Sequence, residues 1–305
     1  MATDGEAGSP NLFRVGAVHS MPKIKKHRNR NQYLLTNGGL WVRDFNQVCQ
    51  PIDINNLTSC DDFRQLMQNE MDIRAMQIPE IGSEFLPTFP KVIIVSDGYD
   101  FNKKKHILYD LPSDVRIIAT NRVLAKWDVS KDGTVKRKID FYFVSNPYNE
   151  CMSFLPSHNY RPRCICSIRT NPLFLKKYKG TCFYYIPTGD LGFGRKRSAV
   201  KSLDDYRNPI CGAVSIAHRC NVRKLAFMCC DDVMKEGRPT MEQLSNGLWT
   251  YPQHHIMHQL LDGQVYWLKQ QEDYKIEVVD HSSGPKYENI SYIELDKLVE
   301  FFDDN

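Results

Sequence analysis

The chain has 305 residues, of which 42% are hydrophobic, 11% aromatic and 25% charged, a globular composition that argues against a collagen-like fibre, a coiled coil and a wholly disordered chain. Its 40 Lys and Arg against 36 Asp and Glu leave a formal net charge of +4, too mild for a dedicated nucleic-acid-binding protein. No stretch approaches the roughly 18 apolar residues of a membrane span, and the N-terminus lacks the layout of a secretory signal. We therefore expect a cytoplasmic protein without a membrane span.

The first 90 residues differ from the rest. Residues 1–50 carry a basic run at 23–30 and little periodicity, which predicts an extended basic arm, a candidate docking segment for a partner chain, a nucleic acid or the protein's own body. Residues 51–90 predict a helix at 59–76, where apolar side chains recur at helical spacing, followed by a linker with three prolines.

From residue 91 to 305 the sequence predicts an α/β domain. Short apolar runs alternate with helical stretches, and the runs are apolar on both faces, as in a sheet covered on both sides. We expect a Rossmann-like, mostly parallel sheet with helices on both faces. The expected strands lie at 91–98, 115–121, 139–146, 163–169, 181–187, 222–232 and 275–284.

Polar residues follow these strands, where ligands of open parallel sheets bind. Amide side chains suit a base or ribose, and small residues permit close approach to a phosphate. No G-x-G-x-x-G or P-loop motif is present, so an ordinary dinucleotide enzyme or P-loop ATPase is not expected. The candidate ligand-binding residues at strand ends are Ser96, Asp97, Gly98, Asn121, Asn146, Asp232, Ser282 and Ser283.

Two helix starts add candidates. Asn208 followed by Pro209 predicts the cap of a small-residue helix whose N-terminus faces the same cleft. Tyr251, His254, His255 and His258 gather at the start of a helix that runs to about residue 271. Because histidine titrates near neutral pH, these residues are candidates for a general base.

Metal binding is not predicted. Ten cysteines are scattered through a chain large enough to build its own core, so reduced thiols are expected. Cys164-Ile165-Cys166 and Cys229-Cys230 are present, but no C-x-x-C pair is followed by a second one, as a zinc site requires.

The order of these motifs resembles the bacterial sialyltransferases of glycosyltransferase family forty-two and the related sialyltransferase-like domain of unknown function 115, linked to flagellin glycosylation. The resemblance covers roughly residues 91–279. The family's Gly-Asn-Gly-Pro-Ser-like loop is matched by Ser96-Asp97-Gly98-Tyr99-Asp100, with Asp97 at the nucleotide-contacting Asn. Two further nucleotide-contacting asparagines are matched by Asn121 and Asn146.

The later motifs of the family are matched by a helix, a strand and a turn near the C-terminus. In the Gly-x-Asp turn, Cys230 stands at the glycine and Asp232 at the aspartate; His281-Ser282-Ser283 is similar to a terminal Asn-Ser. A histidine base precedes the penultimate helix in the family, and His255 is the preferred match over His254 and His258.

The resemblance implies an inverting, metal-independent glycosyltransferase that uses a nucleotide sugar, CMP-linked or other, and a glycan or protein acceptor. A cationic or phenolic group would meet the leaving phosphate: Tyr251, Arg207 or the run Arg195-Lys196-Arg197.

Two alternatives stay open. The archaeal branch of the domain 115 group resembles pterin pyrophosphokinases, which would require Mg²⁺ and ATP and would give Asp97, Asp231 and Asp232 the leading role. The second alternative is a non-catalytic assembly or binding module that docks through the N-terminal arm. A homo-oligomer is compatible with all three hypotheses.

Overall fold

The computed structural model describes residues 33–36, 39–43, 49–51, 60–82, 86–187, 208–231, 233–237, 241–250 and 252–303. Its main feature is an eight-stranded sheet in the order β14-β13-β9-β4-β5-β6-β7-β8, in which every neighbouring pair is parallel. The strands are β4 (Lys91–Val95), β5 (Arg116–Thr120), β6 (Phe141–Val144), β7 (Arg163–Ser167), β8 (Cys182–Tyr185), β9 (Lys224–Met228), β13 (Glu277–His281) and β14 (Ser291–Tyr292).

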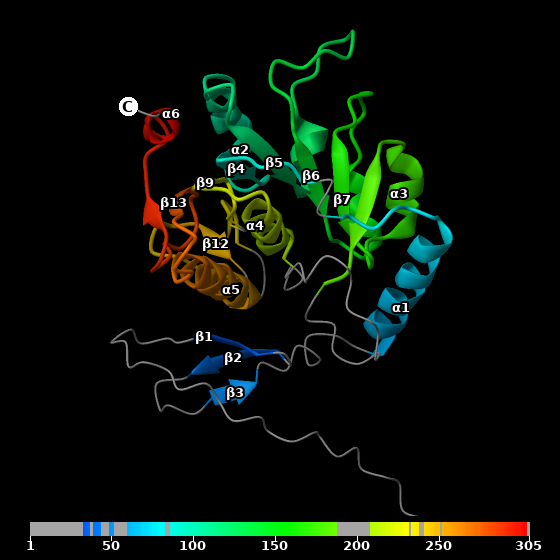
Figure 1. Cartoon of the computed structure of the whole chain (residues 1–305), viewed down its shortest axis with the longest axis horizontal. Coiled ribbons are helices and arrows are strands. Elements are labelled where there is room, and N and C mark those ends of the chain that lie inside the picture. Colours follow the sequence, from blue (N-terminus) through cyan, green and yellow to red (C-terminus); the bar gives the residue numbers. More distant parts are fainter. Residues whose placement is uncertain are drawn as a thin grey trace, which may run out of the picture.

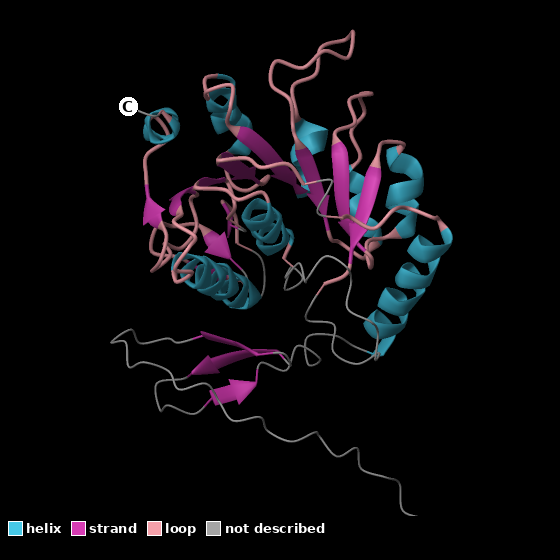
Figure 2. Ribbon diagram, in the orientation of Figure 1, coloured by secondary structure: helices cyan, strands magenta, loops and turns pink. Residues whose placement is uncertain are grey.

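Helices lie on both faces of this sheet (Figures 1 and 2). They are α1 (Cys60–Ala75), α2 (Phe101–Lys104), α3 (Pro172–Tyr178), α4 (Pro209–Arg219), α5 (Pro252–Lys269) and α6 (Lys297–Phe302), with 3₁₀ segments η3 (Lys105–Tyr109), η4 (Asn121–Lys126) and η5 (Asn149–Phe154). The predicted Rossmann-like α/β fold is confirmed, as are the helix at 59–76 and all seven predicted strands.

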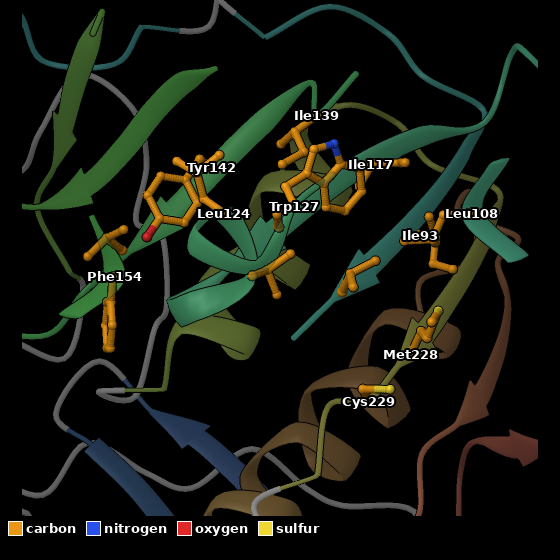
Figure 3. Packing of buried hydrophobic residues seen from close by; sticks show 14 of the residues in the cluster. Ile93, Leu108, Ile117, Leu124, Trp127, Ile139, Tyr142, Phe154, Met228 and Cys229 are labelled. Atoms are coloured by element: carbon orange, nitrogen blue, oxygen red, sulfur yellow. The ribbon is translucent and has the colours of Figure 1, made fainter. Parts of the chain in front are cut away.

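Each face of the sheet has its own hydrophobic core. One core joins alternate strand residues to η3, η4, η5, α3 and α6, and ten of its residues are labelled in Figure 3, Ile93, Tyr142 and Met228 among them. The opposite core joins the other strand residues to α4 and α5. The central strands are buried on both sides, which is why their sequences are continuous apolar runs rather than alternating ones.

Short strands lie outside the main sheet. The segment predicted as an extended arm contains an antiparallel sheet of β1 (Tyr33–Thr36), β2 (Gly39–Arg43) and β3 (Cys49–Pro51). Between the paired residues Thr36 and Gly39 the sequence is Asn37-Gly38, the dipeptide most typical of two-residue hairpins. A second small sheet is formed by β10 (Val233–Met234), β11 (Glu242–Gln243) and β12 (Trp249–Thr250).

Two further findings concern the described residues as a whole. None of their helices is both long and apolar enough to cross a membrane. The eight cysteines whose side chains are described are free thiols, and all but Cys182 are buried.

Candidate functional site

The order of the strands reverses beside β4. From β4 the chain moves through β5, β6 and β7 to β8 at one edge, then returns to the other side of β4 and continues through β9, β13 and β14. In open parallel sheets, ligands bind outside the carboxyl ends of the strands where such a reversal occurs. We call the loops after β4, β9 and β13 the switch-point loops, residues 96–99, 229–231 and 282–284.

Asp231 ties the switch-point loops together. Its side chain is buried, with 2% exposed. One carboxylate oxygen accepts the N–H of Tyr99 after β4 at 2.7 Å, and the other accepts the N–H of Ser283 after β13 at 2.7 Å. Two backbone donors give this buried carboxylate charge-assisted hydrogen bonds. Asp231 therefore links three strand ends through one side chain.

Gly98 allows two of these loops to lie directly on each other. Its N–H donates to the carbonyl of Cys229 at 3.0 Å. A Cβ at this position would lie 2.4 Å from that carbonyl oxygen and 2.4 Å from Asp231 Oδ1, closer than real contacts permit. The predicted site residues Ser96 and Gly98 thus lie at the switch point, where Ser96 is buried and its N–H donates to the carbonyl of Met228.

In the turn after β9, the residue with a left-handed backbone lies one position earlier than the family pattern suggested. Cys229 has a φ of 53°, the left-handed region that favours glycine, whereas the match placed Cys230 at the glycine. Counted from Cys229, a Gly-x-Asp pattern ends at Asp231. The predicted residue Asp232 lies outside the described residues.

Ser282 and Ser283, in the loop after β13, are held by hydrogen bonds from other segments. The Ser282 hydroxyl accepts the N–H of Cys230 at 2.9 Å. The Ser283 hydroxyl accepts a hydrogen bond from Lys104 Nζ at 3.1 Å. The backbone carbonyl of Ser283 accepts one from Asn246 Nδ2 at 2.8 Å. The backbone and side chain of Ser283 are thus fixed from three directions.

Two ionisable residues at the end of β13 lie beneath these serines. Asp280 is 4% exposed and its Oδ1 has no hydrogen-bond partner; burial raises its pKa to about 7 against the opposing effect of a hydrogen bond with Ser282. His281 is also buried, and its Nδ1 lies 3.0 Å from the carbonyl of Ile293. Burial lowers the pKa of His281. This arrangement keeps one carboxyl group near its point of protonation at neutral pH.

Helix α5 brings His258 to the same turn. A Cβ on Gly284 would lie 3.0 Å from Asp231 Cβ and 3.3 Å from His258 Cε1, so the imidazole and the bridging aspartate flank one glycine. The ring of His258 also stacks on Tyr287, with centroids 5.3 Å apart. Of the two predicted histidines whose side chains are described, His258 is therefore the one that lies at the switch point.

The other aromatic candidates lie elsewhere or are not described. His254, one helical turn before His258, has its Nδ1 3.4 Å from the hydroxyl of Thr250. Tyr251 and the side chain of His255 lie outside the described residues, as do Arg207 and the run at 195–197.

Asp97 lies in the switch-point loop after β4, and Asn121 follows the neighbouring strand β5. Asn121 has a φ of 53°, and its carbonyl accepts from the buried Tyr142 hydroxyl at 2.6 Å. Asp97 accepts from the N–H of Arg122 at 3.4 Å and forms an ion pair with Lys126 at 3.3 Å. The Lys126 ammonium offsets the negative charge that Asp97 brings where the family has an asparagine.

Asn146 and Asn208 make local contacts. Asn146 Oδ1 accepts the N–H of Tyr148 at 2.8 Å, which stabilises the turn after β6. Asn208 caps α4 as predicted: its Oδ1 accepts the N–H of Ile210 at 2.9 Å, with Pro209 in the first turn. Within the described residues, no hydrogen bond joins either side chain to the switch-point loops.

Reasoning from the sequence missed Lys104 and Asp280. Lys104 belongs to a run of three lysines, which gives no sign of which one turns inward. Asp280 did leave a signal, because it is the one acidic residue within the apolar run Val278-Val279-Asp280-His281. Across the described part of the chain, no three His, Cys, Asp or Glu side chains are grouped as metal ligands.

Comparison with known proteins bears on the fold. Neither a protein-family model nor a curated protein matches this chain. Among solved structures it is similar to the MAf glycosyltransferase from Magnetospirillum magneticum AMB-1, with a TM-score of 0.53 and 14% sequence identity. The match covers 76% of this chain and 38% of that chain. The two proteins thus share an α/β architecture, and this chain spans well under half of the length of its structural neighbour.

Proposed function

We propose that this protein is a glycosyltransferase that moves a sugar from a nucleotide-activated donor to an acceptor hydroxyl. The observation that carries the proposal is the convergence of Asp231, Lys104, the two serines and His258 at the strand-order reversal. A carboxylate, an ammonium and an imidazole in one place suit a reaction in which a proton moves and a phosphate leaves. The fold shared with the MAf glycosyltransferase adds support.

The donor would lie across the carboxyl ends of the central strands. Its nucleoside would face Asn121 and Asn146, whose side chains are neutral and can both donate and accept hydrogen bonds. Its phosphate and sugar would face the switch-point loops. We assign the two parts of the donor in this way because amides can hydrogen-bond to a base, whereas a phosphate binds to a cation and to backbone N–H groups that it can approach closely.

The proposed reaction is a single displacement with inversion. The acceptor oxygen attacks the anomeric carbon, and the new C–O bond forms as the bond between that carbon and the phosphate oxygen breaks. The electron pair of the broken bond leaves with the nucleotide, and the proton of the acceptor hydroxyl passes to a histidine. We assign that role to His258, because it flanks the same glycine as Asp231; His255, the match preferred from sequence, has no described side chain.

No metal ion enters this scheme, and the acceptor would be a glycan or a protein. A cytoplasmic location is part of the proposal. Docking through residues 1–50 and assembly into a homo-oligomer stay predictions, which the full-length protein can test by size-exclusion chromatography with light scattering.

The first test is a thermal-shift panel of CMP, CDP, UDP, GDP and ATP, each with and without Mg²⁺. Binding stabilises a protein by RT ln(1 + [L]/Kd), so a micromolar ligand at millimolar concentration raises the free energy of unfolding by roughly 4 kcal/mol. We expect one nucleotide of the panel to raise the melting temperature, by the same amount with Mg²⁺ as without it.

The panel also distinguishes the alternatives. A shift with ATP that requires Mg²⁺ would support the pyrophosphokinase instead. No shift with any nucleotide would contradict the glycosyltransferase and favour the non-catalytic module. A matched variant is Asn121→Gly, which keeps the left-handed backbone and removes the amide.

A further inference from the structure

Four lysines lie close to the strand-order reversal, and three of them have an acidic partner. Lys103 pairs with Asp100 at 2.8 Å, Lys105 with Asp128 at 2.5 Å, and Lys126 with Asp97 at 3.3 Å. The exception is Lys104, the last residue of α2, which donates to a neutral hydroxyl, that of Ser283. Among the described residues, no carboxylate oxygen lies within the 4.0 Å ion-pair distance of its Nζ.

Lys104 is also the lysine that joins two strand ends. It comes from the segment after β4 and reaches Ser283 after β13, across the end of β9. Burial raises the pKa of Cys229 and of Asp280 and lowers that of His281. The positive charge of Lys104 acts on all three in the lowering direction, so it opposes burial at the first two and adds to it at His281. The ammonium therefore lies over the switch-point loops rather than in bulk solvent.

Neither acidic residue beneath Lys104 forms a described ion pair with it. The Asp231 carboxylate is engaged by the N–H groups of Tyr99 and Ser283. Asp280 is so well buried that its pKa is raised to about 7, so its carboxyl group is in part uncharged at neutral pH. The described hydrogen bond of the half-buried Lys104 ammonium goes to a neutral hydroxyl, so its charge is available to an anionic ligand.

We infer that Lys104 binds the phosphate of the nucleotide donor at the Ser283–Gly284 turn. This inference rests on the proposed function and identifies the cation of the same site. The contact with Ser283 uses one of the three donors of an ammonium, and Gly284 lets a ligand approach the backbone. When the bond to the sugar breaks, negative charge grows on the phosphate oxygen, and Lys104 stabilises it.

The inference adds Lys104 to the cation candidates chosen from the sequence. Tyr251, Arg207 and the run at 195–197 lie outside the described residues, whereas Lys104 is positioned by a described hydrogen bond. A protein-supplied cation over the leaving phosphate would perform the charge neutralisation for which many transferases use Mg²⁺.

Isothermal titration of the full-length protein with the nucleotide identified by the panel tests this role. Lys104→Gln retains a donor for Ser283 but removes the charge, and we expect it to weaken nucleotide binding by about 10- to 100-fold. Lys104→Arg should retain most of the affinity. Lys103→Met, which changes the neighbouring exposed lysine, should bind as the wild type does.

A second readout separates charge from structure. Added NaCl should weaken nucleotide binding to the wild type more steeply than binding to Lys104→Gln, because salt screens the ammonium–phosphate attraction. The melting temperature of each variant without nucleotide reports any effect on folding.

The outcomes bear separately on the two proposals. If the wild type binds nucleotide and Lys104→Gln binds equally well, the role of Lys104 is overturned and the glycosyltransferase stands. The same holds if Lys103→Met loses as much affinity as Lys104→Gln, or if Lys104→Arg recovers none. If the wild type binds no nucleotide, both proposals fail together.

Discussion

The carboxyl edge of the sheet has two halves that differ in how they hold polar groups. After β4, β9 and β13, titratable side chains are buried: Asp231 and Asp280 are at most 4% exposed, and Asp231 accepts two backbone N–H groups. After β6 and β7, the side chains that bond to backbone groups are neutral amides. Asn69 of α1, 1% exposed, donates to the carbonyls of Pro147 and Arg169, and Asn171 caps α3.

The difference assigns distinct chemistry to each half. A buried charge interacts strongly with a ligand because little water screens it, but it costs free energy unless it is bonded. Amides carry no such cost and recognise a ligand by shape and hydrogen bonding. The charged half therefore suits the phosphate and the moving proton, and the neutral half suits a nucleoside.

Replacing Asp231 should break the charged half most severely. Asp231→Ala leaves the N–H groups of Tyr99 and Ser283 without their charged acceptor in a buried place. We expect the free energy of unfolding to fall by about 5 kcal/mol, at about 1.5–3 kcal/mol for each such bond. Urea denaturation measures it. Asp100→Asn, which removes the surface ion pair with Lys103, should cost under about 1 kcal/mol; equal losses in both variants would contradict the bridge.

Loss of His258 should slow transfer strongly while leaving nucleotide binding intact. With the sugar donor whose nucleotide raises the melting temperature, we expect His258→Asn to lower kcat about a thousandfold, equivalent to roughly 4 kcal/mol in the barrier. Initial rates of nucleotide release measure this. His254→Asn, one turn away on α5, is the matched control. A kcat that falls with His254→Asn and not with His258→Asn would exchange the two roles.

Asp280 should make stability depend on pH. Because burial raises its pKa to about 7 in the folded protein from the ordinary 3.8, the native state holds the proton more tightly than the unfolded chain. Its stabilising contribution is complete at low pH and is lost as pH rises through 7, a fall of about 3 kcal/mol between about pH 4.5 and 7.5.

The variant Asp280→Asn cannot titrate and should lack that fall. Relative to the wild type, its free energy of unfolding should therefore increase with pH. Asp273→Asn, at an exposed position, should follow the wild-type curve. Parallel curves for the wild type and Asp280→Asn in urea titrations at several pH values would show that Asp280 is not protonated at neutral pH.

The same contrast explains what the sequence could predict. The seven strands at 91–284 were predictable because burial on both faces demands continuous apolar runs. β14, two exposed residues long, and the small β10–β12 sheet carry no such pattern. The strands at 33–51 were missed although Asn37-Gly38 is a hairpin signal.

From the sequence, the location of the candidate site at the strand ends could be predicted better than the role of each residue in it. Strand ends pointed to Ser96, Gly98, Ser282 and Ser283, which do meet at the switch point. Side-chain direction could not be read from the sequence, so Asp232 was chosen rather than Asp231, and the three consecutive lysines were not distinguished. Such choices depend on one backbone torsion, and the left-handed φ of Cys229 decides which residue of its turn faces inward.

Asn121, which follows β5 beside the neutral half, offers the smallest effect and tests whether amides at these strand ends contact the nucleoside. Because its φ of 53° suits Asn and Gly but strains other residues, Asn121→Ala should lower the free energy of unfolding by about 1 kcal/mol, and Asn121→Gly should lower it less. Both variants lack the amide, so both should bind nucleotide about 5- to 30-fold more weakly, by roughly 1–2 kcal/mol.

Comparing the two variants separates recognition from strain. Tyr142 donates to the Asn121 carbonyl, a backbone contact that neither substitution removes, so equal losses of affinity in calorimetry mean that the amide itself contacts the ligand. If only Asn121→Ala binds weakly, the effect is backbone strain, and the nucleoside must lie elsewhere along the edge. In that event the neutral half would serve to hold α1 and α3 against the sheet, and recognition of the base would fall to residues beyond the amide-bearing strand ends.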